Sequence, residues 1–257
     1  MSDTGATTNT TVLTEQRGRV LLITLNRPEA MNAINTELSQ GLLAAIAQLD
    51  GDDGLTAGVL TGAGRGFCAG MDLKAFATSG PPIGLDQFFV HGAKKPLIAA
   101  IEGFALAGGL ELALSCDLLV AANNVRLGIP EAGVGLFAAG GAVLRLPGRV
   151  PYAVAMEMAL TADPISAEAA HGYGLVSRLA EPGKAAEVAM ELAERIARNA
   201  PLSVAASKTI IKATQGMTEA EAWDYQRPFV ASVFTSNDAK EGPRAFAEKR
   251  APNWSGT

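Results

Sequence analysis

Short apolar runs, rich in β-branched residues, alternate with segments of helical spacing along the first half of this 257-residue chain. The runs lie at residues 20–25, 58–61, 96–101 and 118–122, next to Gly, Pro, Asn or Asp residues. Runs of this length and composition are typical of buried strands. Residues 12–16 are expected to be the hairpin partner of the first run. The alternation of strands with helices predicts an α/β fold.

Helical spacing is clearest after residue 35, where five leucine and isoleucine side chains recur at intervals of three and four residues. A helix capped by Asn35 or Thr36 is expected there, ending in the Asp- and Gly-rich segment 50–54. A second helix is expected between the last two strands, at residues 109–116. Because these segments separate successive strands, they are expected to cover the sheet.

Beyond Pro164 the sequence becomes mainly helical. Gly, Pro and Thr residues divide it into four expected helices, at residues 166–172, 183–199, 201–215 and 219–235. Most of these segments are amphipathic, which predicts a helical layer packed on the sheet.

Composition and charge exclude several classes of protein. With 48% apolar and 18% charged residues, the chain is expected to be compact rather than disordered. Its 21 basic and 26 acidic residues give a net charge of −5, which does not favour nucleic acid as a partner. Cys68 and Cys116 lie in apolar segments, which argues against a disulfide or zinc framework and favours a reduced, cytoplasmic location.

Neither a signal peptide nor a membrane span is expected. Residues 1–11 are rich in Ser and Thr and lack an apolar core, so they are interpreted as a flexible tail. Residues 97–122 are apolar and long enough to span a bilayer, but Glu102, Glu111 and Asp117 interrupt them. The chain is therefore not expected to bind or cross a membrane.

Common nucleophile and nucleotide motifs are missing from the sequence. It contains neither a Gly-x-Ser-x-Gly nucleophile motif nor a phosphate-binding P-loop. The turn at residues 62–66 is similar to a dinucleotide-binding turn, but Phe67 stands where the last glycine would be. This match is weak.

Two other glycine-containing turns offer backbone N–H groups that could bind a ligand. Gly70-Met71 follows a strand and a turn, and Gly108-Gly109 stands where a helix begins. Backbone N–H groups at such places lack intrahelical partners, and glycine lets a ligand oxygen approach closely. Two such donors would form an oxyanion hole. The alternative is that these glycines only allow tight packing.

Two isolated acids stand in apolar surroundings. Glu111 follows Gly108 by about one helical turn, and Glu131 lies in an otherwise uncharged segment. Buried carboxyls have raised pKa values, and two that face one site raise each other further, which suits them to act as acid and base near neutral pH. The alternative is two carboxylates that are satisfied structurally.

Three longer motifs resemble the enoyl-CoA hydratase/isomerase (crotonase) family, at residues 25–34, 66–73 and 103–113, in the order and spacing of that family. The similarity continues at residues 127–131, 170–176 and 241–250. It implies an α/β, crotonase-like (ClpP/crotonase) fold: a spiral of ββα units in residues 12–200, then a C-terminal helical trimerisation region in residues 201–257. The partner implied is a second copy of the chain, in a homotrimer or a dimer of trimers.

The resemblance also implies an activity, the reversible addition of water to a 2-enoyl-CoA thioester to give 3-hydroxyacyl-CoA. The backbone N–H groups of Met71 and Gly108 would hold the thioester oxygen. Glu111 would deprotonate water for attack at Cβ, and Glu131 would exchange the proton at Cα. Two acids favour hydration over isomerisation, because water addition needs one group on water and another on carbon. Isomerisation, other enolate chemistry and non-catalytic acyl-CoA binding remain alternatives.

The residues that match the CoA-binding positions of the family are Arg27, Ala30, Ala69, Asp72, Leu73, Lys74 and Lys249. Placed cations are needed because CoA carries several phosphate charges and the chain is acidic. Lys249 is expected to reach CoA in a neighbouring subunit, although each of these charges has the alternative of a solvated surface position. No metal and no cofactor are implied, since CoA is part of the substrate.

The chain departs from the hydratase pattern at two places. Ala138-Ala139 stands in a segment that is usually richer in glycine, and Met71 replaces a smaller residue. A larger side chain leaves the N–H of residue 71 in place. We therefore expect oxyanion binding to survive while the preference for acyl chain length changes.

Overall fold

The structure is a computed structural model that describes residues 10–80 and 82–257. Of the expected tail, residues 1–9 lie outside the described chain. Thr10 and Thr11 are both joined to Asn26, whose backbone N–H donates to the Thr11 carbonyl at 2.7 Å and whose side-chain amide donates to the Thr10 carbonyl at 2.9 Å.

The strands form two sheets. Six strands form a sheet in the order β1-β2-β3-β4-β6-β9, in which only the β1–β2 pair is antiparallel, and three form a small sheet in the order β5-β7-β8. The strands are β1 Val12–Arg17, β2 Val20–Leu25, β3 Ala57–Gly62, β4 Leu97–Ile101, β5 Phe104–Leu106, β6 Leu118–Ala122, β7 Arg126–Gly128, β8 Ile165–Ser166 and β9 Arg178–Ala180.

The helices lie between and after these strands. They are α1 Thr36–Gly51, α2 Leu73–Ser79, α3 Leu85–His91, α4 Gly108–Ser115, α5 Ala142–Arg145, α6 Tyr152–Thr161, α7 Ala167–Gly172, α8 Ala185–Ala197, α9 Pro201–Ala213, α10 Glu219–Phe234 and α11 Asn237–Ala247. Short 3-10 helices are η1 Pro28–Ala30, η2 Pro130–Val134 and η3 Leu146–Gly148. The helix expected after residue 35 is confirmed, and its cap is Asn35, whose side chain accepts from the Leu38 N–H.

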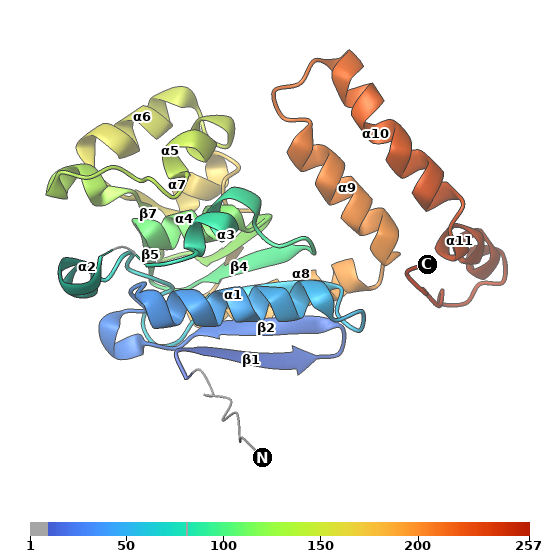
Figure 1. The fold of residues 1–257 in the computed structure, drawn as a ribbon, viewed down its shortest axis with the longest axis horizontal. Coiled ribbons are helices and arrows are strands. Elements are labelled where there is room, and N and C mark those ends of the chain that lie inside the picture. Colours follow the sequence, from blue (N-terminus) through green and yellow to red (C-terminus); the bar gives the residue numbers. More distant parts are fainter. Residues whose placement is uncertain (1–9, 81) are drawn as a thin grey trace.

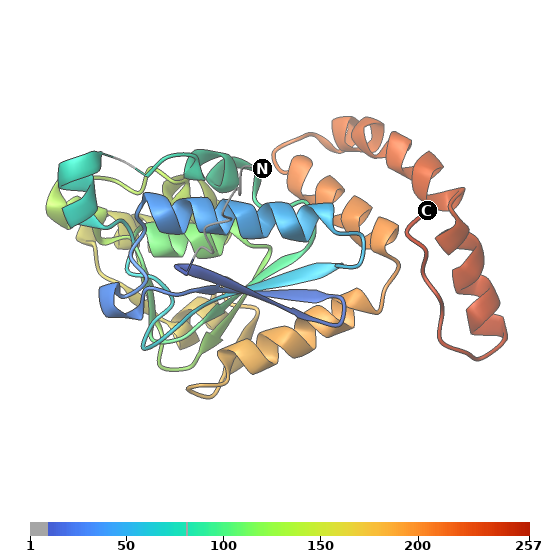
Figure 2. The same ribbon diagram turned by 60° about the horizontal axis from the view of Figure 1, so that its bottom comes forward.

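The large sheet lies between helices (Figure 1), and its central strands are buried on both faces, whereas β1 is mostly exposed. Val20 and Leu22 of β2 belong to the cluster that packs against α8, whereas Leu21, Ile23 and Leu25 belong to the cluster that includes α1. This division follows from the two-residue period of a strand. Figure 2 shows α1 along one face of the sheet and α8 along the other. The strands expected from apolar runs are therefore confirmed as buried strands.

The small sheet was not expected from the sequence, because its strands have only two or three residues. An isolated parallel bridge joins Ala105 of its strand β5 to Cys68, in the segment after β3. A second such bridge joins Met71 of that segment to Ile34, in the segment after β2. The glycine-rich turn after β3 thus leads into a bridge and not into a helix, so it does not form a dinucleotide-binding turn.

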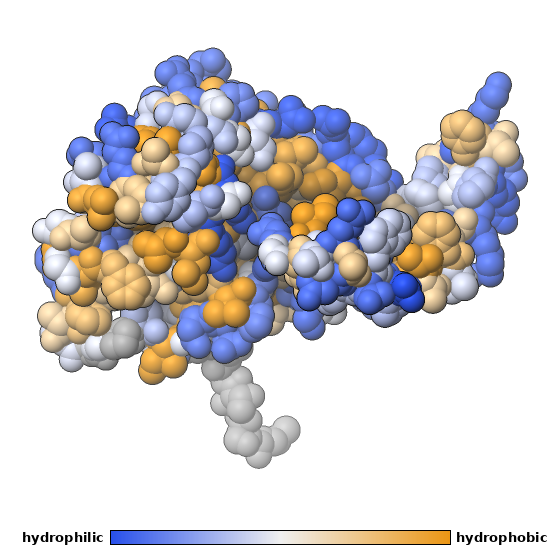
Figure 3. All heavy atoms as spheres, turned by 90° about the horizontal axis from the view of Figure 1, so that it is seen from above, coloured by the Kyte–Doolittle hydropathy of each residue, from blue (hydrophilic) through white to orange (hydrophobic). Residues whose placement is uncertain are grey.

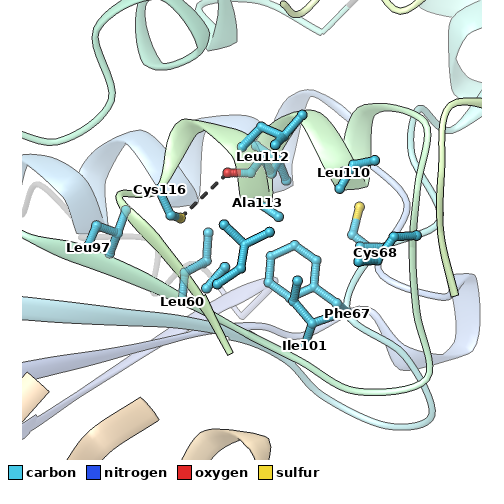
Figure 4. Close-up of a cluster of buried hydrophobic side chains, with 14 of the residues drawn as sticks. Leu60, Phe67, Cys68, Leu97, Ile101, Leu110, Leu112, Ala113 and Cys116 are labelled. Carbon is cyan, nitrogen blue, oxygen red and sulfur yellow. Dashed lines mark hydrogen bonds between the residues drawn. The ribbon is translucent and has the colours of Figure 1, made fainter. Parts of the chain in front are cut away.

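α4 is almost wholly buried, from Gly109 to Ser115. Its Leu112 and Ala113 lie over Leu60 of β3 and Ile101 of β4, and Phe67 fills the space beside them (Figure 4). All of these side chains are fully buried. Packing on this side fixes the helix on the sheet and leaves its other side for the site described below.

The expectation that the late helices form a layer packed on the sheet is wrong for α9 and α10, and α11, which was not among the four expected helices, lies with them away from the sheet. These form an arm beside the body (Figures 1 and 2), and neither α9 nor α10 contains a buried residue. Their apolar side chains stay exposed instead, among them Ile211, Trp223, Val230, Phe234 and Phe246. Figure 3 shows apolar surface on the arm and on the body beside it. Within the part of the chain that is described, no helix has the length and apolar character needed to cross a membrane.

Asn32 joins the loops that follow β2 and β3. It is fully buried, and its amide donates to the carbonyls of Ala63 and Gly66, each at 2.9 Å. Its side-chain oxygen accepts from the Arg27 N–H at 2.9 Å. Its φ of 54° lies in the left-handed region, where Asn is better tolerated than most residues.

Replacing Asn32 with Ala is expected to lower the free energy of unfolding by about 2–4 kcal/mol, because one buried and two part-buried backbone groups lose their hydrogen-bond partner. Asn32→Gly removes the same hydrogen bonds but accepts the positive φ, so it should be less destabilised than Asn32→Ala by about 1 kcal/mol. Denaturant unfolding of the three proteins measures both differences. An Asn32→Ala protein as stable as the wild type would contradict this role.

Candidate active site

Parallel pairing of β5 with β7 places two short segments next to each other. Leu106 pairs with Gly128, and the Ala107 N–H donates to the Gly128 carbonyl at 2.9 Å. The carboxyl ends of the two strands therefore lie side by side. α4, which carries Glu111, begins just beyond β5, and η2, which carries Glu131, begins just beyond β7.

The backbone N–H groups of Met71 and Gly108 lie close together. A methyl group placed on Gly108 would lie 3.7 Å from the Met71 nitrogen. Neither N–H donates to an acceptor within the described chain. Gly70 makes the close approach possible, because its φ is 100° and a Cβ there would come within 2.6 Å of the Ala107 Cβ and 3.2 Å of the Gly108 nitrogen. Two unpaired donors on neighbouring segments suit an oxygen that gains negative charge.

The start of α4 also needs glycine. A Cβ on Gly109 would lie 2.2 Å from the Cys68 carbonyl oxygen, so only glycine lets α4 approach the Cys68 segment this closely. Ala107, which precedes the helix, has a φ of 51°. The helix start therefore follows a residue in an uncommon backbone conformation and packs closely against the Cys68 segment.

Glu111 is buried, with only 4% of its surface exposed. Its Oε1 accepts from the Ala142 N–H at 3.1 Å. Burial raises the pKa of this carboxyl, against the opposing effects of the Ala142 and Gly140 amides and of the Arg145 charge. Glu111 is therefore a desolvated carboxyl whose ionised form is partly stabilised by the surrounding donors.

Glu131 is half-buried, and its Oε2 is a buried atom with no hydrogen-bond partner in the described chain. Burial raises its pKa to about 7, its own backbone N–H opposes the rise, and the negative charge of Glu111 adds to it. The two carboxyls are therefore near enough for the charge of Glu111 to act on Glu131. Both pKa values are raised, as predicted for two acids in apolar surroundings.

Six of the seven expected CoA-binding residues lie on one side of this site. Arg27 and Ala30 stand in the loop after β2, while Ala69 and Asp72 stand on either side of Met71. The Arg27 guanidinium pairs with Asp72 at 3.1 Å and also donates to the Ala33 carbonyl, so its charge holds the two loops together. Asp72 in turn caps α2 by accepting from the Ala75 N–H.

Leu73 and Lys74 begin α2 and are both exposed at this edge. Lys249 is not brought to the same place. It follows α11 in the arm, at the opposite end of the molecule from α2 (Figure 1). Arg250, next to it, is paired with Glu241 and Glu248. Within one chain, Lys249 therefore stands apart from the other six residues.

The segment after Glu131 shows what the departures from the hydratase pattern do. Ala138 is buried and Ala139 is exposed. The next residue, Gly140, leaves room for the Glu111 carboxyl because it has no side chain. A Cβ there would lie 2.6 Å from the Glu111 Oε2 and 2.9 Å from the Phe89 ring. Met71 is partly exposed, and its N–H donates to no acceptor within the described chain.

Sequence reasoning assigned no role to Gly140, Gly141 and Ala142, which surround the Glu111 carboxyl. A Gly-Gly pair directly before a short helix was the available signal, because amides at a helix start bind anions. Arg145, which ends that helix, was also given no role. Both omissions have one cause: the contacts join α4 to a segment some thirty residues later.

The described site has two unpaired backbone amides and two carboxyls whose pKa values are raised by burial. Amides of this kind stabilise an enolate or oxyanion, and the carboxyls can move protons on either side of it. Such an arrangement suits proton transfer at carbons next to a carbonyl.

Comparison with known proteins agrees with this chemistry. The family model described as "Enoyl-CoA hydratase/isomerase" matches residues 15–257. Enoyl-CoA hydratase EchA19 of Mycobacterium tuberculosis is 43% identical over 256 residues, covering 94% of this chain and 95% of the relative. Carnitinyl-CoA dehydratase of Proteus mirabilis is 41% identical over 254 residues, covering 93% of this chain and 96% of the relative.

Among solved structures, an enoyl-CoA hydratase from Mycobacterium tuberculosis H37Rv is 54% identical and superposes with a TM-score of 0.92, covering 96% of this chain and 100% of that chain. A probable enoyl-CoA hydratase/isomerase from Mycobacterium abscessus is 52% identical, with a TM-score of 0.93 and coverage of 96% and 99%. The fold and nearly the whole length of the chain are shared with these proteins. The chain therefore belongs to the enoyl-CoA hydratase/isomerase family of enzymes and has the crotonase fold that its sequence motifs implied.

Proposed function

We propose that this enzyme is an enoyl-CoA hydratase, a hydro-lyase that adds water reversibly across the double bond of a 2-enoyl-CoA. The observation that carries the proposal is the pair of interacting carboxyls, Glu111 and Glu131, beside the unpaired N–H groups of Met71 and Gly108. Isomerisation of a double bond needs a single group that moves a proton between two carbons, whereas hydration needs one group on water and one on carbon.

The two amides begin the reaction by binding the thioester carbonyl oxygen. Their N–H groups withdraw electron density from the conjugated system, which makes Cβ electrophilic. As the water oxygen bonds to Cβ, the C=C electrons move toward the carbonyl and an enolate oxygen develops between the two donors. Each well-placed donor stabilises such an oxygen by about 3–4 kcal/mol.

Glu111 and Glu131 carry the two protons. The ionised Glu111 accepts a proton from the attacking water, so that hydroxide is delivered to Cβ. The protonated Glu131 donates its proton to Cα as the enolate collapses to the thioester. The product is 3-hydroxyacyl-CoA, and the two carboxyls exchange protonation states, which solvent then resets.

The binding side of the proposal uses the edge formed by Arg27, Ala30, Ala69, Asp72, Leu73 and Lys74. Lys74 supplies an exposed cation there for a CoA phosphate, and Lys249 would contribute from a neighbouring copy. A cytoplasmic homotrimer or dimer of trimers belongs to the same proposal. The exposed apolar side chains of the arm and the two free, buried thiols support it. The reaction requires no metal or cofactor, since the amides perform the polarisation.

Dehydration of a 3-hydroxyacyl-CoA is the same reaction in reverse, and relatives named carnitinyl-CoA dehydratase make carnitinyl-CoA a substrate to include in tests. Double-bond isomerisation is the second candidate function, favoured by the family model that covers both reactions. Purified protein incubated with short, long, branched and aromatic enoyl-CoAs and with carnitinyl-CoA separates these outcomes by chromatography. Absence of any 3-hydroxyacyl-CoA product, with a shifted double bond instead, would identify an isomerase.

Glu111→Gln and Glu131→Gln are each expected to lower kcat by about 10² to 10⁴, because each removes one proton-transfer step. The affinity for the acyl-CoA should change little, since the amides and the CoA-binding edge remain. Loss of absorbance of the enoyl thioester gives kcat, and calorimetric titration gives the dissociation constant. Glu102→Gln, which changes a glutamate on the loop after β4, serves as the matched control.

Unchanged turnover in either active-site variant would contradict the assigned roles. A protein that binds acyl-CoA with the same affinity before and after both changes, and turns over none of the substrates, would be a binding protein instead.

The rate of hydration is expected to follow a bell-shaped pH profile. Glu131 must be protonated, so kcat falls as the pH rises through about 7, the pKa of that carboxyl. Glu111 must be ionised, so kcat also falls as the pH is lowered through the pKa of Glu111. Because burial raises this pKa, the acidic fall occurs at a higher pH than an ordinary glutamate would give. Because the two groups interact, the profile reports pKa values of the pair. A kcat independent of pH between 5 and 9, roughly the range spanned by such tuned carboxyls, would contradict this assignment.

Stability should also depend on pH through Glu131. Its pKa is raised from 4.5 to about 7, so the unfolded chain ionises at a lower pH than the folded protein. The folded state therefore loses stability as the pH rises from 4.5 to 7, and the loss persists above pH 7. Glu131→Gln lacks this loss, so its melting temperature should rise relative to the wild type over that range. If the melting temperatures of the two proteins differed by the same amount at every pH between 4.5 and 7, this would contradict the raised pKa of Glu131.

A further inference from the structure

Arg145 is a half-buried cation at the end of α5 that the mechanism above does not use. Within the described residues no carboxylate lies within ion-pair distance of its guanidinium. Its Nη1 donates to the Gly140 carbonyl at 3.2 Å, and its Nη2 donates to the Phe89 carbonyl near the end of α3. A desolvated guanidinium with only carbonyl partners is unusual and calls for an explanation.

The Arg145 side chain lies against the loop that surrounds Glu111. Gly141 has a φ of 105°, and a Cβ there would come within 2.5 Å of the Arg145 Nη1. On the other side of the same loop, Gly140 faces the Glu111 Oε2, and the Ala142 N–H donates to the Glu111 Oε1. The loop 140–142 therefore lies between a cation and a carboxylate.

We propose that Arg145 is a positioning residue for Glu111: it fastens the loop 140–142 to α3, so that the amides of this loop hold the Glu111 carboxylate toward the substrate. The proposal deepens the proposed function, on which its catalytic consequence rests. Arg145 acts through the loop and does not touch the substrate.

The fork of the guanidinium explains why arginine is suited to this place. One planar group donates to two carbonyls from different elements at once, α3 and the segment before α5. Lysine could reach only one of them with a comparable geometry, and a neutral side chain would leave the Glu111 carboxylate without its facing cation.

The charges around Glu111 determine the electrostatic effect of this arrangement. Glu131 of η2 faces Glu111 with like charge, and Arg145 of α5 faces it with opposite charge. α3, which also packs on α4, carries Asp86 and His91, both exposed, and β5 carries no ionisable side chain. Arg145 is thus the cation that opposes both burial and Glu131, and it lowers the pKa of Glu111.

Arg149 provides a matched control. It is also half-buried, it lies four residues further along the chain, and its charge acts on Arg145. Its own environment is Cys116 and Asp117, not the loop 140–142. Arg149→Gln therefore removes a charge of the same kind from the same region without removing a contact to that loop.

The test compares the wild type with Arg145→Gln, Arg145→Lys and Arg149→Gln. Infrared titration of the free proteins follows the carboxylate band that Glu111→Gln removes, and the pH profile of kcat follows its acidic limb. In Arg145→Gln we expect the pKa of Glu111, and with it the acidic limb, to move up by about one unit. Arg145→Lys should keep the pKa within a few tenths of a unit and lower kcat, because one carbonyl contact is lost. Arg149→Gln should retain the wild-type values.

A lower melting temperature in Arg145→Gln with an unchanged Glu111 pKa would show a merely structural residue and overturn the proposal. A wild-type kcat in Arg145→Lys would also overturn it, because a cation without the two-carbonyl fork would then be sufficient to position Glu111. The infrared titration needs no turnover. If Arg145→Gln shifts the pKa of Glu111 but the wild type hydrates no enoyl-CoA, the positioning role is supported and the proposed function is contradicted. If the wild type hydrates enoyl-CoA but Arg145→Gln leaves the pKa of Glu111 unchanged, the proposed function is supported and the positioning role is contradicted.

Discussion

The parallel pairing of β5 with β7 is the interaction on which the site depends. Each strand has three residues, yet their register puts the residues after Leu106 beside those after Gly128. One end leads into α4 with its free N–H and Glu111, and the other leads into η2 with Glu131. A shift of this register by two residues, about 6–7 Å along a strand, would separate the two carboxyls.

Close contact between backbones serves the same purpose elsewhere in the site. Gly70 and Gly109 leave no room for a Cβ, so the segment before α2 and the start of α4 approach each other directly. Buried Asn32 and the Arg27–Asp72 ion pair hold the loops that bring Met71 there. The amides at Met71 and Gly108 are therefore held in place before any ligand binds, which is the condition under which such donors stabilise charge most effectively.

The carboxyls of Glu111 and Glu131 are both desolvated by burial, but they differ in the donors and charges around them. Burial is the largest influence on the pKa of both, but Glu111 has amide donors and a facing cation, whereas the Oε2 of Glu131 has no partner in the described chain. Donors and a cation favour the ionised form, and their absence favours the protonated one. This asymmetry supports a base at Glu111 and an acid at Glu131, and Arg145 belongs to the base side of the pair.

Local patterns in the sequence were sufficient for the strands β2, β3, β4 and β6 and for the helix α1, whose cap they left open between Asn35 and Thr36. They also predicted the raised pKa values of Glu111 and Glu131. Apolar period, capping and isolated charge are properties of neighbouring residues. They were not sufficient for β5 and β7, which are too short to carry a period, nor for the arm, whose amphipathic helices look the same whether they cover a sheet or project from it. Contacts such as Arg145 with Phe89 and Gly140 with Glu111 join segments that are distant in the chain. Only the tertiary structure decides such contacts, because they depend on how separately stable elements pack against one another in space.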